Sequence, residues 1–98
     1  MDIKDKPIHP GIYFLNNYIE PLKLSLTETA DILQINLKTL CYFIKAEDPL
    51  TESLAKKIAK ATNTSVVDWM QMQFDLSIWG LKQGNLDNVK AGSLINKD

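Results

Sequence analysis

The stretch between residues 25 and 45 constrains the fold most, because two helix starts and one short turn follow each other there. Ser25 and Glu28 have the spacing of a capping box, in which a hydroxyl and a carboxylate satisfy free N–H groups at a helix start. Asn36 is suited to cap a second helix after a turn of three residues. The spacing predicts either a helix–turn–helix unit, whose second helix enters the major groove of DNA, or an ordinary hairpin of two packed helices.

Helical spacing of apolar residues continues through most of the remaining chain. It predicts further helices over about 12–20, 52–61 and 66–79, and no segment alternates apolar and polar residues as a strand does. The residues that start or stop these helices are Pro21 after the first, Thr51 before the second, a capping box over Ser65–Asp68 before the third, and Gly80 and Gly84 at its end.

A chain of 98 residues has room for one hydrophobic core. We expect a compact all-α domain of five short helices over residues 11–82, preceded by an extended arm over 1–10 and followed by a flexible tail over 83–98. The residues expected to face the core are Ile12, Leu15, Ile19, Leu22, Leu26, Thr29, Ala30, Leu33, Leu40, Phe43, Ile44, Leu54, Ile58 and Ala61.

Composition excludes several classes of function. A net charge of −1 provides no basic excess to drive nucleic-acid or membrane binding by bulk charge. The lone Cys41 excludes an internal disulfide, and the lone His9 excludes a multi-histidine metal site. No nucleophile–base pair or paired-carboxylate site can be assembled, so we expect neither an enzyme nor a bound metal or cofactor. We expect His9 to be a structural cap of the first helix.

The basic residues are unusual, because all eleven are lysine and none is arginine. Arginine makes the commonest two-pronged contact to guanine and inserts into narrow minor grooves. Any specific contact of this chain with DNA must therefore use lysine or uncharged side chains.

Nothing in the sequence predicts a membrane partner. No apolar stretch approaches the roughly 18–20 residues of a membrane-spanning helix. The first seven residues alternate in charge and lack the apolar segment of a signal peptide. With its lone thiol, the protein is expected to be cytoplasmic.

The last expected helix carries two opposed apolar stripes, whereas a helix that covers the core of a monomer needs only one. Either the first helix or the arm covers the second stripe, or this stripe binds a partner, for which tryptophan is a common anchor. We expect a homodimer through the second stripe. The first stripe is Val67, Met70, Phe74, Ile78 and Leu81, and the second is Trp69, Met72, Leu76 and Trp79.

Several segments together resemble the HigA family of antitoxins, within the wider Xre/Cro-like helix-turn-helix class. The resemblance covers residues 7–82, and its most specific parts are the opening His-Pro-Gly and the tryptophan-containing last helix. The segments that carry it are His9–Gly11, Leu24–Ala30, Thr39–Leu40, Leu54–Ala61, Thr64–Gln73 and Asp75–Leu76.

The resemblance implies a lambda-repressor-like domain, a homodimer, and an autorepressor that binds a palindromic operator near its own promoter. It also implies tight binding to a HigB toxin, a RelE-like mRNA endonuclease that the antitoxin neutralises. Two other functions stay open: a free-standing Xre-type regulator without a toxin, and a toxin inhibitor whose DNA-reading surface has decayed. We expect the toxin to bind the arm with the first helix, or the tail.

The residues expected to contact DNA lie on the second helix of the helix–turn–helix unit and at its ends. Lys38 is suited to donate to guanine O6 and N7, and Leu37 is suited to pack on a thymine methyl group. The candidate DNA-binding residues are Asn36, Leu37, Lys38, Thr39, Tyr42 and Lys45.

The sequence departs from the family pattern where DNA is read. Gln34 replaces the usual turn glycine and must adopt a left-handed conformation if the turn is unchanged. Leu37 and Tyr42 stand where the family usually has arginine, and Glu47 and Asp48 bring two carboxylates close to the expected phosphate path. We therefore expect operator binding that is weaker than usual, biased to A·T-rich sites and dependent on dimerisation.

Overall fold

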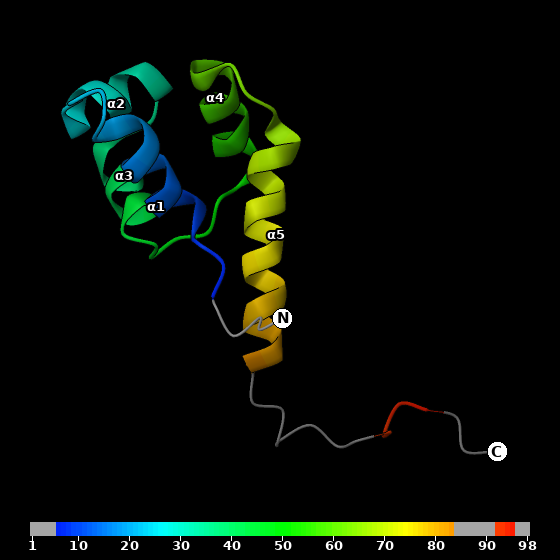
Figure 1. Ribbon diagram of the computed structural model, residues 1–98. Coiled ribbons are helices and arrows are strands. Elements are labelled where there is room, and N and C mark those ends of the chain that lie inside the picture. The colour runs from blue at the N-terminus through cyan, green and yellow to red at the C-terminus, as the bar shows by residue number, and fades with distance from the viewer. Residues whose placement is uncertain (1–5, 84–91, 96–98) are drawn as a thin grey trace.

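The computed structural model describes residues 6–83 and 92–95, and within them the protein is all-α. Its longest helix, α5, extends beyond the other helices, and the arm that precedes α1 lies beside its lower part (Figure 1). No helix of the described residues has the length and apolar character needed to cross a membrane. The tail expected over residues 83–98 lies largely outside the described residues. In chain order the elements are α1 (Pro10–Phe14), the π-helical turn η1 (Leu15–Ile19), α2 (Leu26–Leu33), α3 (Leu37–Ile44), α4 (Glu52–Thr62) and α5 (Val66–Gln83).

Both helices of the helix–turn–helix unit begin where the sequence predicts. Ser25 Oγ accepts a hydrogen bond from Glu28 N at 3.0 Å, and Glu28 Oε1 accepts one from Ser25 N at 2.9 Å, so the capping box of α2 is complete. At the start of α3, Asn36 Oδ1 accepts from Thr39 N at 2.7 Å. These caps are made by short side chains to nearby backbone, which is why the sequence alone identifies them.

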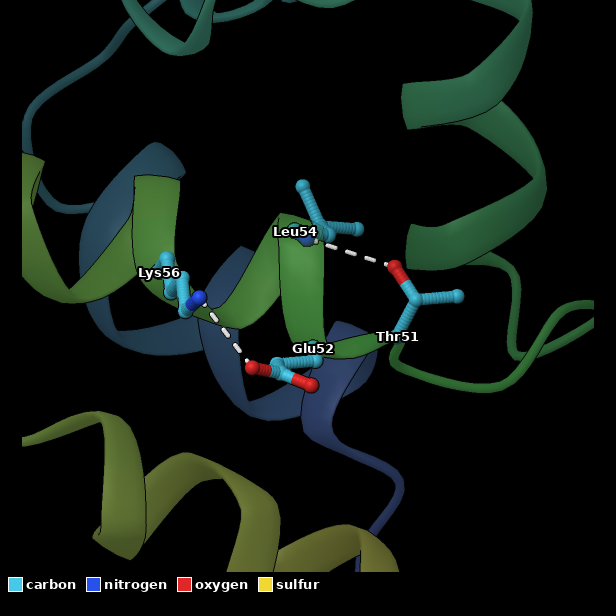
Figure 2. Close-up of polar contacts among 4 residues, drawn as sticks. All are labelled: Thr51, Glu52, Leu54 and Lys56. Atoms are coloured by element: carbon cyan, nitrogen blue, oxygen red, sulfur yellow. Dashed lines mark hydrogen bonds and ion pairs between the residues drawn. The ribbon is translucent and has the colours of Figure 1, made fainter.

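The last two helices also start at their predicted caps. Thr51 Oγ1 accepts from Leu54 N at 3.2 Å at the start of α4 (Figure 2). At the start of α5, Ser65 Oγ accepts from the second and third N–H groups after it, at 3.1 and 3.4 Å. The predicted capping box is therefore present in part: among the described contacts, the Ser65 hydroxyl caps the helix, but the Ser65 N–H makes no hydrogen bond to the Asp68 carboxylate.

Four helical segments end on residues with positive φ, and none of these residues is glycine. In each case the next N–H bonds to the carbonyl oxygen five residues before it, at 2.9 to 3.0 Å, which closes the helix end in a Schellman arrangement. The left-handed conformation predicted for Gln34 is confirmed among them. The four residues are Lys23 (φ 55°), Gln34 (φ 57°), Ala46 (φ 62°) and Asn63 (φ 55°).

The first helix changes its period halfway along. In η1, Glu20 N donates to Leu15 O at 2.9 Å, a bond that spans five residues instead of four. This wider turn puts Phe14 and Ile19 on the same buried side. It also rotates the following residues, so Leu22, which was expected to face the core, is exposed.

The His-Pro-Gly segment explains how the first helix packs against α3. His9 Nδ1 accepts from Gly11 N at 2.9 Å, so His9 is the cap that the sequence predicts, and Pro10 occupies the first helical position, where no N–H is needed. A Cβ added to Gly11 would lie 1.8 Å from the carbonyl oxygen of Phe43. Only glycine therefore permits this close contact between the start of α1 and the backbone of α3.

The core is built from the inner sides of all the helices. The predicted inner residues of α2 and α3 are buried or pack against the core, and Leu54 and Ile58 of α4 are buried as expected. The prediction for Ala61 was wrong, because α4 turns Ala55 and Ala59 inward instead. The small alanines let α4 approach its neighbours α2 and α5 closely.

The structure buries the tryptophan of the apolar stripe of α5 that was expected to meet a partner. Trp69 is only 2% exposed, and its Nε1 donates to Thr64 Oγ1 at 2.7 Å. The rings of Tyr13, Phe14 and Tyr18 surround it at centroid distances of 5.6 to 6.1 Å. The first helix thus covers the start of the second stripe, as one of the two alternatives proposed, and Trp69 is a core residue that a partner cannot reach.

The stripe expected to face the core is only partly buried: Met70 packs against the core and Ile78 is half-buried, whereas the other three residues are exposed. Val67, Phe74 and Leu81 are 72%, 59% and 72% exposed, and they follow each other at seven-residue intervals along α5. The helix also runs past the expected end near Trp79 and through Gly80, the first of the two glycines expected to mark its end, and it ends at Gln83, directly before the second. A single glycine costs a helix only about 1 kcal/mol, which the neighbouring turns can offset.

Candidate nucleic-acid interface

The outward side of α3 carries the residues that the sequence assigned to DNA. Leu40, Phe43 and Ile44 face the core, so at 100° per residue the opposite direction falls between Lys38 and Tyr42. Lys45 lies on this outward side, and Leu37 and Thr39 lie on its two flanks. Asn36, Leu37, Lys38, Thr39, Tyr42 and Lys45 are all exposed.

Two of these outward residues contact each other. The Lys38 ammonium lies 5.8 Å from the centroid of the Tyr42 ring, one helical turn further along α3. This distance is within the range of a cation–π interaction. The pair therefore presents an aromatic face and a cation together at the middle of the exposed side.

The turn between α2 and α3 is held by a residue that the sequence did not single out for this role. Lys57 Nζ of α4 donates to the carbonyl oxygen of Gln34 at 3.0 Å, and the Gln34 side-chain amide donates to Asp31 O at 2.7 Å. Its neighbour Lys56 pairs with Glu52 of the same helix at 3.1 Å (Figure 2). No local spacing signals the Lys57 contact, because it joins residues 23 positions apart.

Acidic residues lie against the end of α3, as the sequence led us to expect. The backbone N–H groups of Glu47 and Asp48 both donate to Tyr42 O, at 2.9 and 3.3 Å, which folds the loop back onto the helix. Two carboxylates therefore lie near the end of α3 that carries Lys45. These two carboxylates equal Lys38 and Lys45 in number, so α3 with this loop has no excess positive charge to attract a phosphate backbone.

His9 ties this acidic loop to the first helix. Its Nε2 lies 2.9 Å from Asp48 O, and its Nδ1 accepts from Gly11 N, so a neutral ring with the proton on Nε2 satisfies both contacts. Burial lowers the pKa of His9 below its ordinary value of 6.5. The Asp48 carbonyl opposes this shift, and the nearby charge of Lys6 adds to it. His9 is therefore a neutral linker between α1 and the loop that follows α3.

Leu76 and Trp79 of the expected interface stripe line a groove beside the arm. Met72 packs against the core, whereas Leu76 and Trp79 are half-buried. The Lys6 ammonium lies 5.4 Å from the Trp79 ring, and Ile8 lines the same groove of about 510 Å³. The arm thus covers part of the stripe, and the fully exposed apolar residues of α5 are on its opposite side.

Comparison with known proteins agrees with this architecture. No protein-family model matches the chain. The uncharacterized HTH-type transcriptional regulator YbaQ of Escherichia coli K12 is 32% identical over 89 residues, which cover 91% of this chain and 79% of YbaQ.

Solved structures of antitoxins share the fold. A HigA-family addiction module antidote protein from Coxiella burnetii has a TM-score of 0.74 and 25% identity, with 81% of this chain and 87% of that chain covered. The Pseudomonas aeruginosa antitoxin HigA, solved with the higBA promoter, has a TM-score of 0.75 and 21% identity, with 79% and 84% covered. Together with the exposed outer side of α3, the similarity to YbaQ establishes that the chain belongs to the HTH-type transcriptional regulators, and its fold is the one that the HigA antitoxin structures share.

Proposed function

We propose that this protein is a DNA-binding antitoxin that represses its own operon and neutralises a HigB-like, RelE-type mRNA endonuclease. The observation that carries the DNA-binding part is the exposed side of α3, where Lys38, Tyr42 and Lys45 point away from the core. Hydrogen bonds at the start of each helix and at the turn hold this surface in position. A helix presented in this way fits the major groove, which is about 12 Å wide.

The Pseudomonas aeruginosa relative supports the operator as the target, because it was solved with the promoter of its own operon. In this chain the reading residues are Lys38 and Leu37 for base edges, with Asn36, Thr39 and Lys45 directed at phosphates or flanking bases. The offsetting charges of Glu47 and Asp48 make binding weaker and more dependent on dimer formation than in a surface rich in arginine.

Fluorescence anisotropy tests the DNA-binding part. The labelled duplex comes from the region just upstream of the gene, and a scrambled duplex of equal length is the control, each at two salt concentrations. We expect selective binding whose affinity falls as salt rises. Equal binding of both duplexes at either salt concentration would contradict sequence-specific repression.

Co-expression tests the toxin-binding part. We expect that the gene adjacent to this one is toxic when expressed alone, and that this protein restores growth and co-purifies with its product. An exposed-surface variant such as Lys38→Met should restore growth equally well, because α3 is assigned to DNA. A harmless neighbour, or toxicity that this protein does not relieve, would favour a free-standing regulator instead.

The exposed stripe of α5 is the proposed contact with a second copy of the chain. Val67, Phe74 and Leu81 repeat every seven residues, which is the spacing of a seam between two packed helices. A two-fold dimer would also match a palindromic operator. Phe74→Asp is expected to lower the solution mass to that of a monomer, whereas Thr27→Asp, an equal charge change on α2, should leave it unchanged. An unchanged mass for Phe74→Asp would exclude this stripe as the interface.

A second candidate function is a toxin inhibitor that no longer reads DNA. The exposed leucine and the two carboxylates beside α3 favour it, because each removes favourable contact with phosphates. The co-expression and anisotropy experiments separate the candidates: such an inhibitor relieves toxicity but shows no selectivity for the upstream duplex.

A further inference from the structure

The cation–π contact on α3 gives Tyr42 a role that its exposure alone does not suggest. We infer that Lys38 and Tyr42 form one reading unit, in which the Tyr42 ring orients the Lys38 ammonium toward a guanine in the major groove. The inference rests on the proposed DNA binding. Tyr42 is then a positioning residue for sequence specificity, and its hydroxyl is not required as a phosphate contact.

A lysine needs such a support more than an arginine does. Arginine presents a rigid planar fork, whereas the lysine ammonium ends a flexible four-carbon chain and loses rotamer freedom when it binds. This chain contains no arginine, so lysine must provide any cationic contact to guanine. With Nζ held 5.8 Å from the ring centroid, part of that freedom is already lost before DNA binds.

The ammonium remains available to DNA in this arrangement. The contact with the ring engages the charge of Lys38 and not its N–H donors, so these can still reach the O6 and N7 atoms of guanine. Both side chains are exposed on α3. Within residues 6–83 and 92–95, the structure contains one ion pair, Lys56–Glu52 on α4, so no carboxylate there pairs with the Lys38 ammonium.

Selection from a pool of duplexes with a randomised centre tests the inference. The unmodified protein should enrich a sequence with a guanine at one fixed position in each half-site. Lys38→Met should reduce the preference for that guanine about tenfold. Tyr42→Leu should reduce it about two- to fivefold at the same position, and Tyr42→Phe should retain it, because phenylalanine keeps the ring face.

Lys45→Met is the matched control, since it removes an equal charge from the same side of α3 without touching the ring. We expect it to weaken binding to all sequences alike and to lower the salt dependence by about one unit, with the guanine preference unchanged. In the enriched duplex, that guanine is then replaced with 7-deazaguanine, which lacks N7. This replacement should weaken the binding of the unmodified protein more than it weakens the binding of the Lys38→Met variant. If Tyr42 had only a structural role, Tyr42→Leu would not change the preference for one base at one position.

Four outcomes would overturn the inference, and the last would also overturn the proposed DNA binding. Tyr42→Phe could lose as much preference as Tyr42→Leu, which would assign the role to the hydroxyl. Tyr42→Leu could weaken all sequences equally, which would make Tyr42 a backbone contact. Lys38→Met could leave an enriched sequence unchanged, in which case DNA binding stands and only the reading unit fails. If no sequence is enriched at all, the proposed DNA binding fails together with the inference.

Discussion

The helix–turn–helix unit and α5 are both amphipathic, yet only the first has a face that the sequence assigns correctly. In α2 and α3, a single apolar side leaves one way to bury the helix, and the structure uses it. In α5, two opposed apolar stripes are available; Trp69 of one stripe is buried in the core, whereas Phe74 of the other is 59% exposed. The difference teaches that helical spacing predicts a core side only where the alternative side is polar.

The largest expected effect comes from replacing one residue on each side of α5 with alanine. Trp69→Ala should lower the free energy of unfolding by about 3–5 kcal/mol, because it leaves a large cavity among three aromatic rings. Phe74→Ala should change the monomer by less than about 0.5 kcal/mol, since its side chain is mostly exposed. Urea unfolding at a concentration where the protein is monomeric measures both values. Equal losses would mean that both stripes are buried within one chain.

The next test addresses how the first helix meets α3. Gly11→Ala should lower the free energy of unfolding by about 1–3 kcal/mol, because the added methyl group overlaps the Phe43 carbonyl. Gly80→Ala is the matched control: no atom lies within 4 Å of the added Cβ, so this helical site should become more stable by about 0.5–1 kcal/mol. Thermal melting of both variants provides the comparison. A neutral Gly11→Ala would contradict the close contact between α1 and α3.

The pH dependence of stability tests the His9 link. Its pKa is lowered in the folded state, so the neutral ring stabilises the fold above pH 6.5, and this contribution is lost as the pH falls below that value. The unfolding free energy should therefore be lower at pH 5 than at pH 7. In His9→Asn this pH dependence should be weaker, because asparagine can still cap the helix but does not titrate. An identical decrease in both proteins would assign it to other groups.

The smallest effect concerns the left-handed helix ends. Ala46→Gly should raise the free energy of unfolding by about 0.5–1 kcal/mol, because an alanine at φ 62° is strained and glycine is not. Asn63→Gly should change it much less, since asparagine tolerates this conformation. Denaturant midpoints measure the two changes. An equal gain at both sites would show that residue-specific strain is not the cause.

Part of the candidate site was predictable for local reasons. The Asn36 cap and the left-handed Gln34 depend on neighbours within a few residues, so the sequence contains all that determines them. The bond from Lys57 to the turn could not be predicted, because it requires α4 to pack beside α2. The Lys38–Tyr42 contact is intermediate: their spacing allows it, and the structure supplies the distance.

By itself, the sequence determined where the helices begin, that the described fold contains helices and no strands, and which side of α3 is exposed. Those properties follow from capping side chains and from a single apolar stripe, which act within one helix. The tertiary structure alone decided which side of α5 is buried and where the first helix shifts its period. Both depend on what the neighbouring helices offer. The aromatic rings of the first helix and the hydroxyl of Thr64 complement Trp69, whereas Val67, Phe74 and Leu81 on the opposite side are largely exposed.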